Sequence, residues 1–164
     1  MGNKRKVIFL DRDGVINIEQ NDYTWQVDKF QFTKSFFDAI KKLSKAGYDF
    51  IVITNQGGIS KKIYNHFDVN AVHKYMVDRF LDNGINVLEV YYCPHHDEIE
   101  QCICRKPDSL MLEKAIARFN IDVSKSYFIG DSPRDMEAAN KVGVTPIKIT
   151  TNQSLIEILS QINL

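Results

Sequence analysis

The sequence lacks an excess of charge of either sign and lacks long hydrophobic runs. Lysine and arginine together number 21, as do aspartate and glutamate. A neutral chain is unlike proteins that bind nucleic acids or membrane surfaces through bulk electrostatics. A membrane-spanning helix needs about 18 or more consecutive apolar residues, and no stretch approaches that length. We therefore expect neither a nucleic acid nor a membrane as a partner.

Cysteine is scarce, and a linker between domains is missing. The three cysteines, an odd number, do not indicate a disulfide framework. The apolar run behind the basic residues 1–6 ends at Leu10, which is too short for the core of a signal peptide. We expect a cytoplasmic location. The 164 residues fit one domain with a full core, and we predict a single domain over residues 1–164 that works as a monomer.

Patterns typical of strands and helices alternate along the chain. This order predicts a Rossmann-like α/β fold, a parallel sheet between layers of helices. Asp68 is the expected N-cap of the second helix, and Pro146 places the last strand at a sheet edge. The expected strands are residues 7–10, 48–53, 87–92, 127–129 and 145–149, and the expected helices are residues 35–46, 68–83, 110–119, 135–141 and 155–162.

Polar side chains follow three of the expected strands. Asp11 and Asp13 come after the first strand, Thr54 and Asn55 after the second, and Asp131 after the fourth. In an open parallel sheet the carboxyl ends of the strands form the binding crevice. The recurrence of such groups at one edge predicts a functional site there.

These residue types suit phosphoryl transfer. A carboxylate such as Asp11 acts as a nucleophile that forms an aspartyl-phosphate. Asp11 and Asp131 would hold a Mg²⁺ that offsets the charge of the phosphate. Lys106 would add a fixed positive charge, and the polar groups after the second strand would bind phosphate oxygens. Asp13 is the candidate that gives a proton to the leaving group and takes one from water.

Four separated motifs carry a family resemblance. Asp11-Arg12-Asp13-Gly14, Thr54-Asn55, Arg105-Lys106-Pro107 and Gly130-Asp131 with Asp135 resemble the motifs of the haloacid dehalogenase-like (HAD-like) phosphatases, in the same order. The resemblance implies Asp11 as nucleophile and Asp13 as general acid and base. It implies Mg²⁺ held by Asp11, the carbonyl of Asp13 and Asp131, with support from Asp135. It also implies phosphate contacts from Thr54 and Lys106.

The cysteines form a second motif. All three lie within the segment 93–104, as Cys93-Pro94-His95-His96 and Cys102-Ile103-Cys104. Three thiolates and one imidazole make the closed ligand set of a structural Zn²⁺ site. We predict Cys93, His95, Cys102 and Cys104 as ligands in a zinc loop over residues 93–107. His96 is the alternative histidine, and it would otherwise face the active site.

The sequence of the zinc loop makes the family resemblance more specific. It resembles that of the D-glycero-D-manno-heptose 1,7-bisphosphate phosphatases, and the related histidinol-phosphate phosphatases share the zinc site. The chain departs from the heptose pattern at Gly57, at Ser60-Lys61-Lys62 and at Ser109-Leu110-Met111. Hydrolysis of the 7-phosphate of the heptose bisphosphate is the expected activity. Histidinol phosphate or another small phosphosugar is the alternative substrate.

No segment is long enough for a separate cap domain. We expect residues 17–32, the loop after Asn55 and the zinc loop to close the site, with Arg105 paired to a second phosphate. Two further interpretations stay open. One is a phosphosugar-binding module without catalysis, and the other is a phosphatase for nucleic-acid ends or phosphoproteins.

Overall fold

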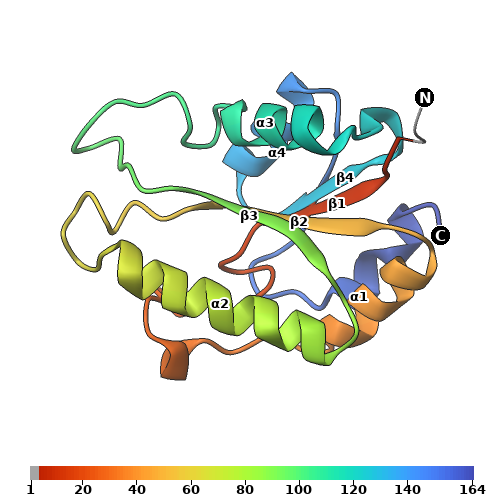
Figure 1. Cartoon of the computed structure of the whole chain (residues 1–164), viewed down its shortest axis with the longest axis horizontal. Helices are drawn as coiled ribbons and strands as arrows, with labels where there is room; N and C mark the ends of the chain where they lie inside the picture. The colour runs from red at the N-terminus through yellow and green to blue at the C-terminus, as the bar shows by residue number, and fades with distance from the viewer. Residues whose placement is uncertain (1–3) are drawn as a thin grey trace.

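A parallel five-stranded sheet with β1 in its centre organises the chain (Figure 1). The computed structural model describes residues 4–164, so the first three residues of the basic segment 1–6 lie outside the described residues. Every residue of β1 is buried, as expected for a strand covered on both faces. The strands, in the spatial order β3-β2-β1-β4-β5, are β3 (Val87–Cys93), β2 (Asp49–Asn55), β1 (Val7–Leu10), β4 (Tyr127–Gly130) and β5 (Thr145–Lys148).

Helices cover both faces of the sheet, which confirms the predicted Rossmann-like layers (Figure 1). Helices α1 (Phe36–Lys45) and α2 (His66–Asp82) cover one face, where the larger of two apolar clusters lies. Helices α3 (Leu110–Phe119) and α4 (Pro133–Lys141) cover the other face over a second cluster. None of the helices described in residues 4–164 is long and apolar enough to cross a membrane.

The start of α2 differs from the prediction. Its N-cap is Asn65, whose side chain accepts hydrogen bonds from the main-chain N–H groups of Phe67 and Asp68. Asp68, the predicted cap, is the third helical residue and accepts a hydrogen bond from the N–H of Asn65. The two side chains thus form a reciprocal capping box. The prediction chose the wrong member of the pair.

The last elements follow the predicted pattern with one change of helix type. β5 lies at the edge of the sheet. Pro146 has no N–H group, so it leaves no main-chain donor without a partner on the open side of this strand. The C-terminal segment forms a 3-10 helix, Leu155–Gln161, which packs near α1 and buries its apolar side chains in the larger cluster. A further short 3-10 helix, Val123–Lys125, precedes β4.

A long connection between β1 and α1 folds back on itself at the carboxyl edge of the sheet. Asn17 and Phe32 form an isolated antiparallel bridge, and the N–H of Ile18 donates to the carbonyl of Gln31 (2.8 Å). We call residues 18–31 the flap. It contains the 3-10 helix Val27–Lys29 and is otherwise irregular. No insertion of cap-domain size interrupts the described chain.

Candidate active site

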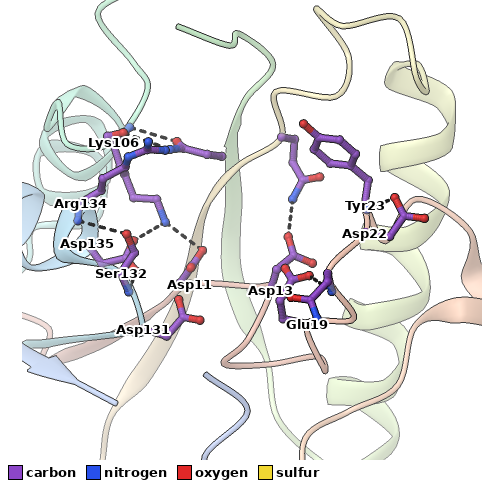
Figure 2. Close-up of a pocket in the computed structure, with 13 residues that line it drawn as sticks. Asp11, Asp13, Glu19, Asp22, Tyr23, Lys106, Asp131, Ser132, Arg134 and Asp135 are labelled. Atoms are coloured by element: carbon purple, nitrogen blue, oxygen red, sulfur yellow. Dashed lines mark hydrogen bonds and ion pairs between the residues drawn. The ribbon is translucent and has the colours of Figure 1, made fainter. Parts of the chain in front are cut away.

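The carboxyl ends of β1, β2 and β4 open into one cavity of about 420 Å³ (Figure 2). The predicted residues Asp11, Asp13, Asn55, Lys106, Asp131 and Asp135 line it. The segments that were expected to close the site contribute further residues, which are Glu19, Asn21, Asp22, Tyr23 and Gln56. Ser132 and Arg134 also line the cavity, and nothing in the sequence indicated them. Six of the lining side chains are carboxylates and two are cations, so the cavity is rich in negative charge before any ligand binds.

Lys106 is buried between two of these carboxylates. Its Nζ atom lies 2.9 Å from Oδ1 of Asp11 and 2.6 Å from Oδ1 of Asp135, and it donates to the carbonyl of Ile53 (2.9 Å). Burial alone would lower the pKa of Lys106, but the two carboxylates outweigh this and raise it. The ammonium group therefore stays charged at the wall of the cavity.

Asp11, Asp131 and Asp135 meet at one point of the cavity. Each offers a carboxylate oxygen, and these atoms lie within 4.8 Å of one another. Burial and the charge of Asp135 raise the pKa of Asp11 above its usual range, although Lys106 acts against them. A divalent cation bound among the three oxygens would relieve this repulsion, and hard oxygen ligands are those that Mg²⁺ prefers. The donor set thus fits Mg²⁺. The carbonyl of Asp13 stays a predicted further ligand.

Glycine permits two close approaches around this cluster. A Cβ atom on Gly130 would lie 2.4 Å from Oδ2 of Asp135. Gly14 has a φ of +82°, and a Cβ atom there would lie 2.2 Å from Oδ2 of Asp131. Both positions therefore need glycine for the carboxylates to converge.

Asp13 lies in a different electrostatic environment from Asp11. Its Oδ1 accepts from Nη2 of Arg12 (2.9 Å) and Nδ2 of Asn17 (3.0 Å), and its Oδ2 accepts from Nε2 of Gln56 (3.1 Å). Burial alone would raise the pKa of Asp13, but the Arg12 charge and these hydrogen bonds lower it. The two carboxylates of the first motif thus have pKa values shifted in opposite directions, as is typical of acid–base pairs with separate roles.

Arg12 is a fully buried cation below the cavity. Besides Asp13, its guanidinium contacts Nε2 of His73 on α2 (3.2 Å) and donates to the carbonyl of Thr24 in the flap (2.7 Å). No role of its own was predicted for Arg12 from the sequence. Because arginine is almost never fully buried unless paired, the residue type gave no signal for this role.

Thr54 and Asn55, the predicted phosphate contacts, are both engaged with protein groups. The Asn55 amide donates to the carbonyl of Lys106 (3.1 Å) and accepts from its N–H (3.0 Å). Thr54 is buried, and its hydroxyl accepts from Nε2 of Gln56 (2.9 Å). Asn55 and Gln56 line the cavity, whereas Thr54 is not among the lining residues. Thr54 therefore borders the site through Gln56.

Arg105, the predicted contact for a second phosphate, lies beside the main cavity. It lines a neighbouring cavity of about 340 Å³, and its Nη1 donates to the carbonyl of His95 (3.0 Å). Lys106 and Arg134 line both cavities. Arg134, in the first turn of α4, is thus the arginine that the structure places at the main cavity, and Arg105 is one cavity further away.

The flap supplies the remaining wall of the main cavity, through Glu19, Asn21, Asp22 and Tyr23. Burial, followed by the charge of Asp13, raises the pKa of Glu19. Tyr23 packs edge-on against Tyr64 from the loop after β2, with ring centroids 5.7 Å apart. This location agrees with the predicted role of residues 17–32 in closing the site.

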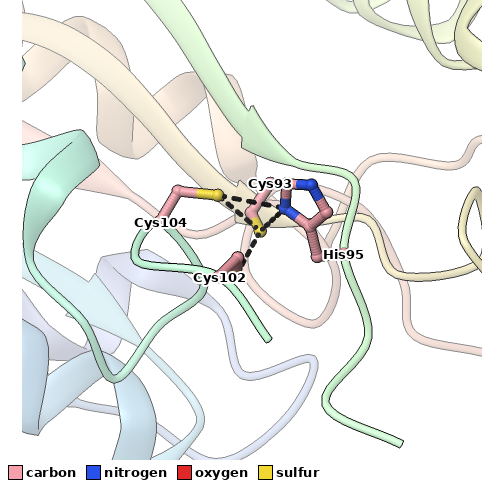
Figure 3. Close-up of side chains that lie close together, drawn as sticks. All are labelled: Cys93, His95, Cys102 and Cys104. Carbon is pink, nitrogen blue, oxygen red and sulfur yellow. Dashed lines mark hydrogen bonds between the residues drawn. The ribbon is translucent and has the colours of Figure 1, made fainter. Parts of the chain in front are cut away.

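The predicted zinc ligands converge at the end of β3, which supplies Cys93, and in the loop that follows it (Figure 3). The Sγ atom of Cys93 lies 3.4 Å from Nδ1 of His95, 3.7 Å from Sγ of Cys102 and 2.9 Å from Sγ of Cys104. In a tetrahedral site with Zn–S bonds of about 2.3 Å, ligand atoms are separated by roughly 3.7 Å. The Cys93 and Cys104 sulfur atoms lie closer together than this, and all four ligand atoms lie within 4.8 Å of one another. The convergence of three thiols and one imidazole is the donor set that fits Zn²⁺.

His96 lies outside the cluster of Cys93, His95, Cys102 and Cys104. Its Nδ1 atom accepts from the N–H of Glu98 (3.2 Å) and lies 3.3 Å from Oδ1 of Asp97. Between the two adjacent histidines, the structure thus selects His95 as the candidate ligand.

Comparisons with known proteins find similar phosphatases. The sequence model of the polynucleotide kinase 3 phosphatase family matches residues 6–152. The D-glycero-beta-D-manno-heptose-1,7-bisphosphate 7-phosphatase of Neisseria meningitidis is 37% identical over 148 residues, which cover 90% of this chain and 79% of that protein. The D-glycero-alpha-D-manno-heptose-1,7-bisphosphate 7-phosphatase of Campylobacter jejuni is 38% identical over 135 residues, or 82% of this chain and 76% of that protein.

A solved structure is similar over nearly the whole chain. The D,D-heptose 1,7-bisphosphate phosphatase from B. bronchiseptica, complexed with magnesium and phosphate, is 31% identical. It superposes with a TM-score of 0.83 over 97% of this chain and 88% of that one. With the family match over residues 6–152, these similarities show that the chain belongs to the polynucleotide kinase 3 phosphatase family of HAD-like phosphatases.

Proposed function

We propose that the protein is a Mg²⁺-dependent phosphatase that removes the 7-phosphate of D-glycero-D-manno-heptose 1,7-bisphosphate through an aspartyl-phosphate. The observation that carries the reaction type is the contact between Asp11 and the buried ammonium of Lys106, beside the carboxylates of Asp131 and Asp135. The proposed substrate is the one that the similar phosphatases are named for.

In the proposed reaction, a carboxylate oxygen of Asp11 attacks phosphorus, and the bond to the sugar oxygen breaks. Asp13 donates a proton to that oxygen and later takes one from the water that attacks the aspartyl-phosphate. This second step releases inorganic phosphate and restores Asp11. Asp13 must carry the donated proton before the attack. The charge of Arg12 and the hydrogen bonds to Asp13 lower its pKa and so favour the ionised form, which is the form that accepts the proton of the attacking water in the second step.

Asp11, Asp131 and the carbonyl of Asp13 are the proposed Mg²⁺ ligands. When bound, Mg²⁺ would offset the negative charge shared by the nucleophile and the phosphate. Asp135 supports the site from behind, because one of its oxygens faces Lys106 and the other accepts from the N–H of Ser132 (3.1 Å).

The positive charge offered to the phosphate comes from Lys106, whose position Asn55 fixes. Arg134 is the candidate for the second phosphate of the substrate, because it lines the main cavity and the neighbouring one. The opposite wall, formed by Glu19 and Asp22 of the flap, offers carboxylate acceptors to sugar hydroxyls.

Histidinol phosphate stays the alternative substrate, although the relatives named above are heptose bisphosphate phosphatases. The flap carboxylates Glu19 and Asp22 would pair with an ammonium group at the far end of a phosphorylated amine. The same carboxylates would repel a second phosphate that lay on their side of the cavity. The substrate preference thus depends on which wall of the cavity contacts the group at the far end of the substrate.

We also propose that Cys93, His95, Cys102 and Cys104 bind a structural Zn²⁺. The metal would order a polar loop that has little apolar core of its own. Because Lys106 follows Cys104 by two residues, this loop also sets the position of the catalytic cation.

We propose in addition that the two apolar clusters make one domain on a shared sheet and that the protein is a monomer.

A substrate panel tests the proposed function. Specificity constants would be measured with Mg²⁺ for both anomers of the heptose bisphosphate, histidinol phosphate, p-nitrophenyl phosphate and a 3′-phosphorylated oligonucleotide. We expect one heptose anomer to exceed every other compound by at least about tenfold. Preference for histidinol phosphate would select the second candidate. Failure to hydrolyse any of them, even p-nitrophenyl phosphate, would mean a binding module.

A further inference from the structure

Thr151 and Asn152 are neighbours in the turn after β5, and their side chains contact two different parts of the active site. The hydroxyl of Thr151 donates to Oδ2 of Asp131 (2.7 Å), one of the candidate metal ligands. The side chain of Asn152 contacts the main chain of Glu19, at the start of the flap. The segment thus lies between the carboxylate cluster and the flap wall of the cavity.

Asn152 holds Glu19 by both functional atoms of its amide. Its Oδ1 accepts from the N–H of Glu19 (2.7 Å), and its Nδ2 donates to the carbonyl of the same residue (3.1 Å). The N–H of Asn152 also donates to the carbonyl of Gly14 (2.8 Å), next to Asp13. One residue therefore ties three segments together, the turn after β5, the nucleophile loop and the flap.

The turn presents the amide in a fixed orientation. Asn152 has a φ of 67°, in the left-handed region that asparagine tolerates better than most residues. On either side of it, the N–H of Gln153 donates to the carbonyl of Thr150, and the N–H of Thr150 donates to Oε1 of Gln153 (both 2.9 Å). The side chain of Asn152 therefore needs little ordering to meet Glu19.

The far end of the same flap segment is also fixed. Arg12 donates to the carbonyl of Thr24 (2.7 Å). Between the fixed points at Glu19 and Thr24 lie Asn21, Asp22 and Tyr23, which line the cavity and are solvent exposed. Loss of the hold at Glu19 would leave this wall held only by the Arg12 contact at Thr24 and by the packing of Tyr23 on Tyr64.

We propose that Asn152 is a positioning residue that sets the flap wall of the cavity for the sugar part of the substrate. It acts on substrate affinity through Glu19 and not on the reacting atoms. This inference rests on the proposed function, because a substrate that extends beyond its phosphate must contact the flap for the wall to matter.

The test compares Asn152→Ala with Asn120→Ala. Asn120 has a φ of 51° and is exposed at the end of α3, so its replacement changes a left-handed asparagine away from the cavity. For Asn152→Ala we expect KM for the heptose bisphosphate to rise about 3- to 10-fold, the loss typical of one or two exposed hydrogen bonds. We expect kcat, and both constants for p-nitrophenyl phosphate, to stay within about twofold. Asn120→Ala should leave all of them unchanged.

Amide hydrogen exchange gives a second measurement that does not depend on turnover. We expect faster exchange in residues 19–24 of Asn152→Ala and no change there in Asn120→Ala. Equal losses on both substrates, or unchanged sugar KM together with unchanged exchange, would overturn the proposal. If wild type hydrolyses p-nitrophenyl phosphate but not the heptose bisphosphate, the proposed substrate is wrong, and the exchange result alone decides whether Asn152 holds the flap.

Discussion

Asn55 holds Lys106 by two hydrogen bonds to its main chain, one donated by the amide (3.1 Å) and one accepted by it (3.0 Å). The two residues are 51 positions apart, at the end of β2 and in the loop after β3. The same lysine then contacts Asp11 and Asp135 with its ammonium group. The end of one strand thereby aligns the cation with the nucleophile at the end of another.

Replacement of Asn55 should therefore impair catalysis through the position of Lys106. For Asn55→Ala we expect kcat for p-nitrophenyl phosphate to fall by about 10- to 100-fold, because small displacements of catalytic groups are that costly. Asn83→Ala is the matched control, since it removes a hydrogen bond to Arg79 at the end of α2 (2.9 Å). An Asn55→Ala enzyme as active as the control would contradict this role.

The two carboxylates of the first motif should respond differently to amide substitution. Asp11→Asn should abolish turnover yet keep or raise the melting temperature, because it removes a charge that burial and Asp135 disfavour. Asp13→Asn should lower the free energy of unfolding by about 2 kcal/mol, since it weakens charge-assisted hydrogen bonds. Thermal melts of both variants at pH 7 measure this. A destabilised Asp11→Asn with an unaffected Asp13→Asn would reverse the assignment.

Removal of a candidate zinc ligand should release the metal. Elemental analysis of wild type should find about one Zn²⁺ per chain, and Cys104→Ser should retain far less. We expect this variant to lose activity as well and to be cleaved by proteases within residues 93–107. His96→Asn is the control, because His96 lies outside the cluster. Zinc loss from His96→Asn but not from Cys104→Ser would disprove the ligand set.

The free energy of unfolding should decrease as the pH falls, because His73 takes up a proton when the protein unfolds. Burial, followed by the charge of Arg12, lowers the pKa of His73 to about 3, against about 6.5 in an unfolded chain. Between these values the unfolded state binds the extra proton, so the free energy of unfolding decreases as pH falls, by up to about 1.4 kcal/mol per pH unit. Urea melts from pH 7 to pH 4 should therefore show a flatter pH dependence for His73→Gln than for wild type.

A matched variant isolates this effect from the general acid response. His66 is exposed at the start of α2, so His66→Gln should keep the wild-type pH dependence. Identical slopes for His73→Gln and wild type would show that His73 does not carry the proton uptake.

The sheet and the catalytic carboxylates were predictable because their signals are local. The buried strands appear in the sequence as short runs of apolar residues. Asp11 and Asp131 directly follow two of these strands. Parallel pairing then brings strand ends together without any knowledge of side-chain packing. The zinc cluster was equally local, since its four ligands lie between Cys93 and Cys104.

The features that the sequence did not predict depend on contacts between residues whose relative positions only the structure gives. Asn65 and Asp68 are both good caps, and only the reciprocal hydrogen bonds show which one begins α2. Arg105 and Lys106 are adjacent cations, yet only Lys106 turns into the main cavity. Asn152 meets Glu19 across 133 residues, a separation over which neither periodicity nor motif spacing gives information.

The central place of β1 has a consequence for the protein as it is being synthesised. β1 pairs with β2 on one edge and with β4 on the other, and β4 begins only at Tyr127 of 164 residues. A nascent chain thus carries an apolar strand with one open edge for most of its translation, a known route to aggregation. The last catalytic motif lies directly after β4, the strand that closes that edge, so the closed sheet and the complete set of catalytic carboxylates depend on the same segment of the chain.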